Sequence, residues 1–416
     1  MRKRMIGILT AGMLLFSLVG CGNDIIVDVV TNENQGAGSQ TANTDTSEKQ
    51  ENTGNEGNGA ESPKTNPAGL ATIAAEDLKV GVLYIGSASD TSGYTYAHEI
   101  GIQGMVANLG LSDSQVIRKE FVDDTDTEAI TKALDECIKE GCNVTFTTSW
   151  GYMEKTAEYA DMYPDIYFAH GTGYMSNGKN FTNYFGRIYQ ARYLSGIVAG
   201  LKTKSNRIGF VSAMGSENSE CTGGIDAFAM GVESVNPDAK VLVAVTNSWF
   251  SPEDEQTASD ALIAEGCDVL AQHVDTTAPQ TASEANGTWA IGYNSDMSKE
   301  TPNATLTSVI WNWSAFYTSY VNSIINATYD ASNYYGGMEE SLVGLTTLSP
   351  LCDEATAAIV SEAQQKILKG EFGVFDGVIL TNDGTTVGED GKTLDDATIT
   401  GGINWYYHNV QLVDWK

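Results

Sequence analysis

Basic residues are scarce in this sequence. Lys and Arg number 23 in 416 residues, against 54 Asp and Glu, so the formal net charge is -31. A nucleic-acid-binding protein needs a basic surface to face the phosphate backbone, and electrostatic docking on anionic lipid needs a polybasic face. The charge balance therefore argues against nucleic acid as a partner, and it disfavours a phosphorylated ligand.

Residue types that carry catalysis or bind metals are also few. The chain has four histidines: His98, His170, His273 and His408. Their spacing matches neither His-x3-His nor His-Glu-x2-His. A Gly-x-Ser-x-Gly elbow, a Walker loop and a Gly-x-Gly-x-x-Gly segment after a strand are absent. We expect no metal, no cofactor and no catalytic activity.

Cysteine is sparse and irregularly spaced. The six cysteines are Cys21, Cys137, Cys142, Cys221, Cys267 and Cys352. They form neither a disulfide framework nor a zinc pattern, and buried free thiols are the favoured interpretation. A bridge between Cys137 and Cys142, five positions apart, is left open.

The N-terminus has the order of a secretory signal. Three basic residues at positions 2–4 precede an apolar run from Met5 to Val19, which is shorter than the ~20 residues of a comfortable membrane span. The ending Leu-Val-Gly-Cys at 18–21 resembles the bacterial lipobox. We expect a signal peptide at 1–20 and lipidation of Cys21, so that the mature protein is extracytoplasmic and lipid-anchored to the cell membrane.

A polar stretch separates the anchor from the folded body. Residues 21–76 are dominated by Asn, Gln, Thr, Gly, Ser and Glu, which bury too little apolar surface to offset the entropy of ordering, so we expect a flexible tether. From Leu78 short apolar runs alternate with amphipathic stretches, which is typical of βαβ units and parallel sheets. We predict an α/β body of two three-layer (αβα) lobes.

Aromatic and small polar residues recur just after the predicted strands. In open α/β sheets, ligands bind beyond the carboxyl ends of the strands. Flat aromatic faces suit flat or ring-shaped ligands, and Asp, Asn and Thr satisfy polar edges. Individual aromatics could instead plug a lobe core or the hinge. The candidate ligand-binding residues are Asp90, Tyr94, Thr95, Trp150, Tyr152, Trp249, Phe250, His273, Asp275, Asn294, Asp296 and Trp311.

Several of these segments carry a family resemblance. The chain from about Leu78 to Asp376 resembles the basic membrane protein family, the substrate-binding lipoproteins of ABC importers with the type I periplasmic-binding-protein fold. The matching stretches are residues 90–101, 146–153, 170–174, 192–200, 247–250, 272–278 and 295–297.

The resemblance implies two lobes joined by a hinge with several crossovers. The ligand-binding domain is expected at 77–380, with the first lobe at about 77–187 and 312–332. The second lobe is expected at about 188–311 and 333–380, and the C-terminal segment, 381–416, is expected to pack on a lobe or the hinge.

The resemblance also implies capture of a purine nucleoside or base between the closing lobes, for delivery to an ABC permease by a monomeric receptor. Tyr94 would stack on the base from the first lobe, and Trp249 or Phe250 from the second. Asp296 would accept from ribose hydroxyls or a base amine, and Asp90 and Thr95 would flank the stacking ring. The alternatives are a receptor for riboflavin or a sugar, a signalling receptor, and an extracytoplasmic nucleoside-processing enzyme.

Overall fold

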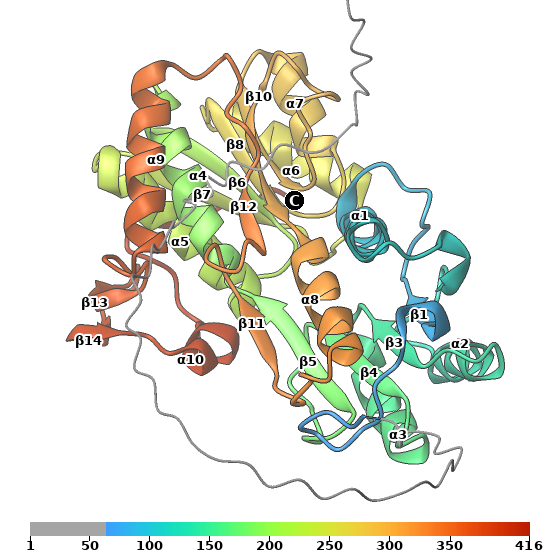
Figure 1. Ribbon diagram of the computed structural model, residues 1–416. Coiled ribbons are helices and arrows are strands. Elements are labelled where there is room, and N and C mark those ends of the chain that lie inside the picture. The colour runs from blue at the N-terminus through green and yellow to red at the C-terminus, as the bar shows by residue number, and fades with distance from the viewer. Residues whose placement is uncertain (1–63) are drawn as a thin grey trace, which may run out of the picture.

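Two lobes, each built on its own sheet, make up the body of the protein (Figure 1). The computed structural model describes residues 64–416. The predicted signal peptide, the lipidated Cys21 and the tether as far as residue 63 lie outside the described residues, so those predictions stay predictions. The last part of the expected tether, residues 64–76, is instead folded onto the first lobe: Leu70 is buried in the core, and Asn66 Nδ2 donates to the Tyr167 hydroxyl at 2.6 Å. The prediction of a flexible tether up to residue 76 is therefore wrong for this part, because Leu70 and Asn66 have partners in the first lobe.

The first lobe contains a six-stranded parallel sheet in the order β11-β5-β4-β3-β1-β2. Its strands are β1 (Val80–Leu83), β2 (Val116–Lys119), β3 (Val144–Thr147), β4 (Tyr167–Gly171), β5 (Phe181–Gly186) and β11 (Tyr334–Gly336). Its helices are α1 (Gly93–Leu109), α2 (Thr127–Lys139), α3 (Met153–Met162) and α8 (Trp313–Ile325). The central strands are buried on both faces, as their continuous apolar runs predict.

The second lobe contains a seven-stranded sheet in the order β12-β10-β9-β8-β6-β7-β15, parallel except for β12. Its strands are β6 (Arg207–Ser212), β7 (Lys240–Val245), β8 (Val269–His273), β9 (Trp289–Asn294), β10 (Thr305–Trp311), β12 (Val343–Leu345) and β15 (Val410–Leu412). Its helices are α4 (Ile188–Lys202), α5 (Ser219–Val235), α6 (Pro252–Ala264), α7 (Ala278–Asn286) and α9 (Glu354–Leu368).

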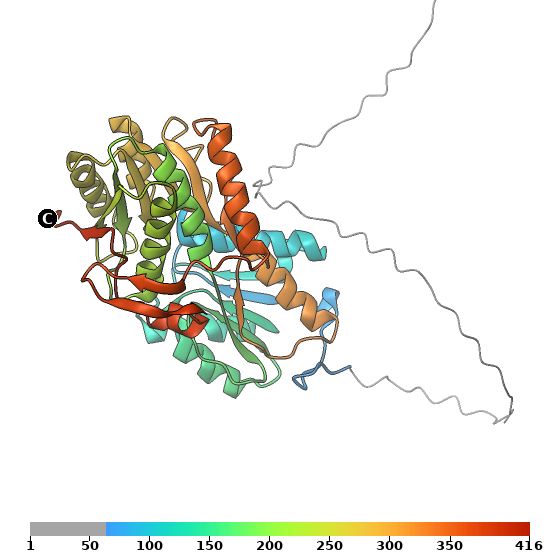
Figure 2. The same ribbon diagram turned by 90° about the vertical axis from the view of Figure 1, so that its left-hand side faces the viewer.

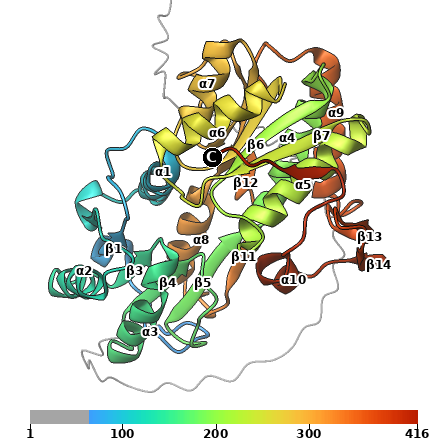
Figure 3. The same ribbon diagram turned by 180° about the vertical axis from the view of Figure 1, so that it is seen from behind.

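The chain crosses between the lobes at three places, after β5, after β10 and after β11. The third crossover lies a few residues later in the chain than the lobe boundary expected near residue 333. Tyr334–Gly336 still belongs to the first sheet, because it pairs in parallel with β5, and the two strands run side by side in Figure 3. The second lobe therefore resumes only after Gly336.

The C-terminal segment spans more than one structural unit. β13 (Asp376–Leu380) and β14 (Thr386–Thr393) form an antiparallel hairpin, so the expected boundary at 380/381 falls inside one motif. The short helix α10 (Asp396–Gly401) follows, and β15 then pairs with β7 at the edge of the second sheet. Figure 2 shows this segment along one side of the molecule.

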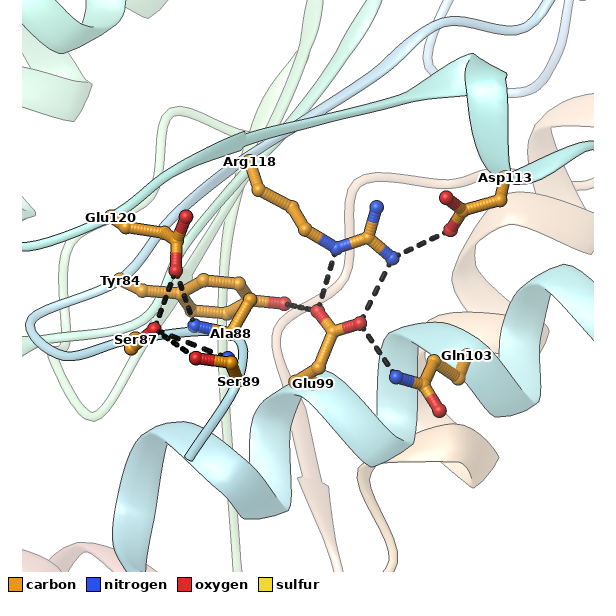
Figure 4. Close-up of polar contacts among 9 residues, drawn as sticks. All are labelled: Tyr84, Ser87, Ala88, Ser89, Glu99, Gln103, Asp113, Arg118 and Glu120. Carbon is orange, nitrogen blue, oxygen red and sulfur yellow. Dashed lines mark hydrogen bonds and ion pairs between the residues drawn. The ribbon is translucent and has the colours of Figure 1, made fainter. Parts of the chain in front are cut away.

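A buried ion pair fixes α1 to the first sheet (Figure 4). The carboxylate of Glu99 accepts from Arg118 Nε at 2.8 Å and Arg118 Nη2 at 2.9 Å. It also accepts from the Tyr84 hydroxyl at 3.0 Å and Gln103 Nε2 at 2.9 Å. Because Glu99 is almost fully buried, this bidentate pair sets the rotation and depth of α1.

Cysteines in the described residues are free, and four of these five thiols are buried. Cys137 and Cys142 lie together beside Gly81 of β1, where a Cβ would stand 2.8 Å from one sulfur and 3.2 Å from the other. Asp126 caps the N-terminus of α2, because its side chain accepts from Glu128 N and Ala129 N.

Candidate functional site

A cavity of about 1090 Å³ lies between the lobes. Both lobes line it, and so does α10 from the C-terminal segment. This volume slightly exceeds the ~300–1,000 Å³ typical of small-molecule sites. The cavity can therefore hold a ring system together with a substituent.

The first lobe lines the cavity mainly with aromatic rings. Its aromatic lining residues are Tyr94, Trp150, Tyr174, Phe185, Tyr334 and Tyr335. Tyr94 begins α1, its hydroxyl donates to the carbonyl oxygen of Thr148, and its ring meets His98 edge-on at 4.5 Å. Trp150 and Tyr174 lie 5.8 Å apart and are more than half exposed, so their faces are free to meet a ligand.

The second lobe supplies most of the carboxylates. Glu217, Glu220, Asp275 and, from α10, Asp396 line the cavity, and Asp124 is added by the first lobe. Among the lining residues in the described part of the chain there is no Lys, Arg or His. Asp396 is paired with Arg187, so the other four carboxylates give the cavity its acidic character.

Asp275 is the carboxylate at the contact between the lobes. Its side chain accepts from Asn294 Nδ2 at 2.7 Å, and its backbone N–H donates to the carbonyl of Trp249 at 2.9 Å. Burial between the lobes raises the pKa of Asp275 to about 7. A Cβ on Gly93, at the start of α1, would stand 2.7 Å from the carbonyl oxygen of Asp275, so the two lobes touch here in a closed arrangement.

Beneath the second-lobe wall lies a buried layer that orients it. Burial lowers the pKa of His273 to about 4, so the ring is neutral, and its Nε2 lies 3.3 Å from Glu220. His273 meets both Trp249 and Tyr293 edge-on. The guanidinium of Arg192 stacks 4.2 Å from the Tyr293 ring and donates to the Gln272 carbonyl at 2.6 Å.

Four of the twelve predicted ligand-binding residues line the cavity: Tyr94, Trp150, Trp249 and Asp275. They come from the ends of different strands in both lobes, and the fold brings them to one cleft. This grouping follows the rule on which the prediction was based, that ligands bind beyond the carboxyl ends of the strands in open α/β sheets (the strand-end rule).

Five others lie behind the cavity wall. Thr95 Oγ1 accepts from Gly86 N at 3.1 Å, and the Tyr152 hydroxyl donates to the Val122 carbonyl at 2.7 Å inside the first lobe. His273 and Asn294 support neighbours that line the cavity. Trp311 stacks on Trp313 and donates from Nε1 to the Tyr293 hydroxyl.

The remaining three are placed away from the lining. Asp90 is exposed and accepts from Ser87 N, and Phe250 is 69% exposed. Asp296 accepts from Ser298 N at 2.9 Å and caps a local turn. Asp296 is thus not among the lining residues of the cavity, whereas Asp275 is, and the ligand role of both stays a prediction.

Sequence reasoning missed two groups of lining residues. Glu217, Asn218, Ser219 and Glu220 follow β6, and the strand-end rule applied to that strand could have found them. Five residues of α10 also line the cavity, and the path of the C-terminal segment brings them there: Asp396, Ala397, Ile399, Thr400 and Gly401. No local sequence signal marks that contact.

Within residues 64–416, no group of three His, Cys, Asp or Glu side chains is placed to hold a metal ion. Over the same range, none of the helices is both long and apolar enough to cross a membrane.

Comparison with known proteins decides the family. Residues 78–372 match the family of PnrA-like ABC transporter substrate-binding proteins. The chain belongs to this family. A purine-binding protein of Brucella abortus (strain 2308) is 34% identical over 342 residues, covering 82% of this chain and 95% of that protein. A putative ABC transporter glucose-binding protein of Haloferax volcanii is 33% identical and covers 73% of this chain and 75% of that protein.

Solved structures show the same architecture for this PnrA-like protein. A solute-binding protein of an ABC transporter from Conexibacter woesei has a TM-score of 0.59 at 17% identity, covering 71% of this chain and 98% of that one. A transcriptional activator of the comK gene from Bacillus halodurans has a TM-score of 0.62 at 19% identity, covering 71% and 99%. The predicted type I periplasmic-binding-protein fold is confirmed.

Proposed function

We propose that this substrate-binding protein captures an unphosphorylated purine, as base or nucleoside, in the cleft and delivers it to an ABC permease. The single observation that carries the proposal is the composition of the cavity, where aromatic rings face carboxylates with no basic side chain among the described lining residues. A purine offers two flat faces for the rings and N–H donors at its edge for the carboxylates.

The energetics of such a site are sufficient. Stacking of a base on an aromatic side chain is worth ~1–3 kcal/mol by alanine substitution in nucleic-acid systems. Two stacking faces, from Tyr94 and Trp249, would supply a large part of the about -8 kcal/mol that a micromolar affinity requires. Hydrogen bonds to the lining carboxylates add to this, including those to Asp275 when the pH is above its pKa of about 7.

The electronegative lining also supports discrimination by charge. A phosphate group would enter a cavity lined by five carboxylates, of which one, Asp396, is paired with Arg187, so the remaining four would repel a nucleotide. A neutral base or nucleoside carries no such penalty.

A sugar is the second candidate, because the Haloferax volcanii relative carries a glucose-binding name. Sugar sites combine one or two aromatic rings with many bidentate polar contacts. The cavity has nine aromatic lining residues, which favours a flat heterocycle. Riboflavin would satisfy the rings as well, and it belongs in the test for that reason.

The proposed receptor acts outside the cytoplasm, as substrate-binding proteins of ABC importers do. It would be held there by the lipid on Cys21, and it would perform no chemistry on the ligand. Closure around the ligand, with Gly93 of α1 meeting Asp275, would be the signal read by the permease.

A thermal-shift panel tests the proposal. Residues 64–416 are melted alone and with adenine, guanine, adenosine, guanosine, inosine, riboflavin or glucose, since a ligand that binds only the native state raises Tm. The expected result is a rise with at least one purine and none with glucose. A rise in Tm with glucose or riboflavin alone would show that the ligand is not a purine. Turnover of a nucleoside at catalytic protein concentration would show that the protein is an enzyme and not a receptor.

A further inference from the structure

The C-terminal segment reaches the cavity although it lies beyond the family match, which ends at residue 372. Five residues of α10 line the cavity: Asp396, Ala397, Ile399, Thr400 and Gly401. Two lobes would suffice for a cleft, so this third element calls for a functional explanation.

The segment is fastened firmly to the second lobe. Ile399 and Ile403 are buried, and Ile403 Cδ1 lies 3.3 Å from the point where a Cβ on Gly223 of α5 would stand. The backbone N–H of Tyr407 donates to Asp226 of α5 at 2.7 Å, and β15 then joins the sheet beside β7. α10 therefore moves with the second lobe.

A bidentate ion pair also ties α10 to a crossover. Arg187, between β5 and α4, donates from Nε and Nη2 to the two carboxylate oxygens of Asp396, at 3.1 and 2.5 Å. Arg187 Nη1 donates to the Tyr335 carbonyl at 2.6 Å, and the backbone N–H of Arg187 donates to the Gly336 carbonyl. This pair therefore ties α10, which lines the cavity, to the segment that joins the two lobes.

α10 and α1 line the cavity from separate places in the fold. Figures 1 and 3 show α1 and α10 on opposite sides of β11. α10 packs against α5, whose first turn contributes Ser219 and Glu220 to the lining. This end of the cavity thus combines hydroxyl and carboxylate groups, which suit a ligand part rich in hydroxyl groups.

The structure assigns to the C-terminal segment a third wall of the binding site, in which α10 and the start of α5 receive the hydroxyl-bearing substituent of a nucleoside while the base stacks near Tyr94. This inference rests on the proposed purine-binding function. It deepens that function by making the cavity-lining residues of α10 determinants of which purine derivatives are accepted.

Gly401 offers a direct test. It lines the cavity, nothing lies within 4 Å of a Cβ placed on it, and its φ is not positive, so a larger side chain has room to enter the cavity. Thr398 is an exposed neighbour on α10 that does not line the cavity and serves as the matched control. The variants Gly401→Trp and Thr398→Trp are titrated with adenine and adenosine by calorimetry, alongside the parent protein.

We expect Gly401→Trp to weaken adenosine binding tenfold or more while adenine binding changes less than threefold, and Thr398→Trp to change neither. Thr400→Phe, which fills the same region from the preceding residue, should repeat the pattern if the Gly401→Trp variant has a lowered melting temperature. Three outcomes would contradict the proposed role of α10. They are equal losses of affinity for adenine and adenosine, no loss of affinity for either ligand, and a parent protein that binds adenine but not adenosine. A parent protein that binds no purine would overturn the proposed function itself.

Discussion

The two lobes present opposite chemistry to the cleft. The first lobe offers six aromatic rings and one carboxylate, whereas the second lobe, with α10, offers four carboxylates and three aromatic rings. The carboxylates also differ in their surroundings. Glu99 of the first lobe is buried inside the fold and paired with Arg118, while Asp275 of the second faces the cavity without a cation. The Glu99 carboxylate stabilises the first lobe, whereas the Asp275 carboxylate is placed to bind a ligand.

The largest expected effect concerns Glu99, the buried carboxylate that stabilises the first lobe. Glu99→Gln removes the charge that Arg118 and the Tyr84 hydroxyl bind, and breaking a buried pair leaves its partner uncompensated. We expect the free energy of unfolding in urea to fall by about 3 kcal/mol. Asp113→Asn, which removes the exposed partner of Arg118, should cost under about 1 kcal/mol. Equal losses for the two variants would show that burial does not distinguish them.

The second lobe and α10 contribute Glu217, Glu220, Asp275 and Asp396 to the lining, and we call these residues the acidic wall. The acidic wall predicts weaker binding of phosphorylated ligands. Adenosine 5′-monophosphate should bind roughly a hundredfold more weakly than adenosine at pH 7.5, a difference of about 2.7 kcal/mol, because no basic side chain is present among the described lining residues. Calorimetric titration of both ligands at the same ionic strength measures the ratio. Comparable affinities would mean that a cation reaches the ligand, and the acidic wall would lose its proposed role.

The aromatic lining residues Tyr94 and Trp249, which we call the aromatic wall, predict that their removal lowers purine affinity without a comparable fall in melting temperature. Tyr94→Ala should weaken purine binding tenfold or more, because one stacking face is removed. Trp249→Ala should do the same from the second lobe. Phe250→Ala, which removes an exposed aromatic outside the lining, is the control and should leave binding unchanged. If the melting temperature of the ligand-free variants falls as steeply as their affinity, the rings belong to the core.

The smallest expected effect is a pH dependence from Asp275. Its pKa is raised to about 7 by burial, so the carboxyl is largely protonated at pH 6 and ionised at pH 8 in the ligand-free protein. An ionised acceptor binds a ligand N–H more strongly by about 1 kcal/mol, so affinity should rise roughly fivefold between these pH values. Asp275→Asn should flatten the profile. A profile that is the same in both proteins would assign the titration to another group.

The sequence was sufficient to predict the lobes and the general place of the site, for identifiable reasons. Continuous apolar runs such as Val80–Leu83 mark strands buried on both faces, and residues at their carboxyl ends meet at one edge of the sheet. Tyr94, Trp150, Trp249 and Asp275 were therefore predictable. Local sequence could not tell whether a side chain at a strand end points into the cleft, as that of Asp275 does, or accepts a hydrogen bond within a turn, as that of Asp296 does.

Other contacts depend on long-range packing. β11 is three residues long, and its place in the first sheet is set by its pairing with β5, about 150 positions earlier in the chain. α10 reaches the cavity because the tail is held by Asp226 and β7. Neither feature has a periodicity or a motif of its own.

Calorimetric titration of residues 64–416 with adenosine, at neutral pH, tests the central claim most directly. The two-walled cleft predicts one site per chain with a micromolar or tighter dissociation constant, and a clear loss of that heat in the double variant Tyr94→Ala/Trp249→Ala. Absence of heat with adenosine and with adenine, from a protein that melts cooperatively, would contradict the claim that the aromatic and acidic walls form a purine site.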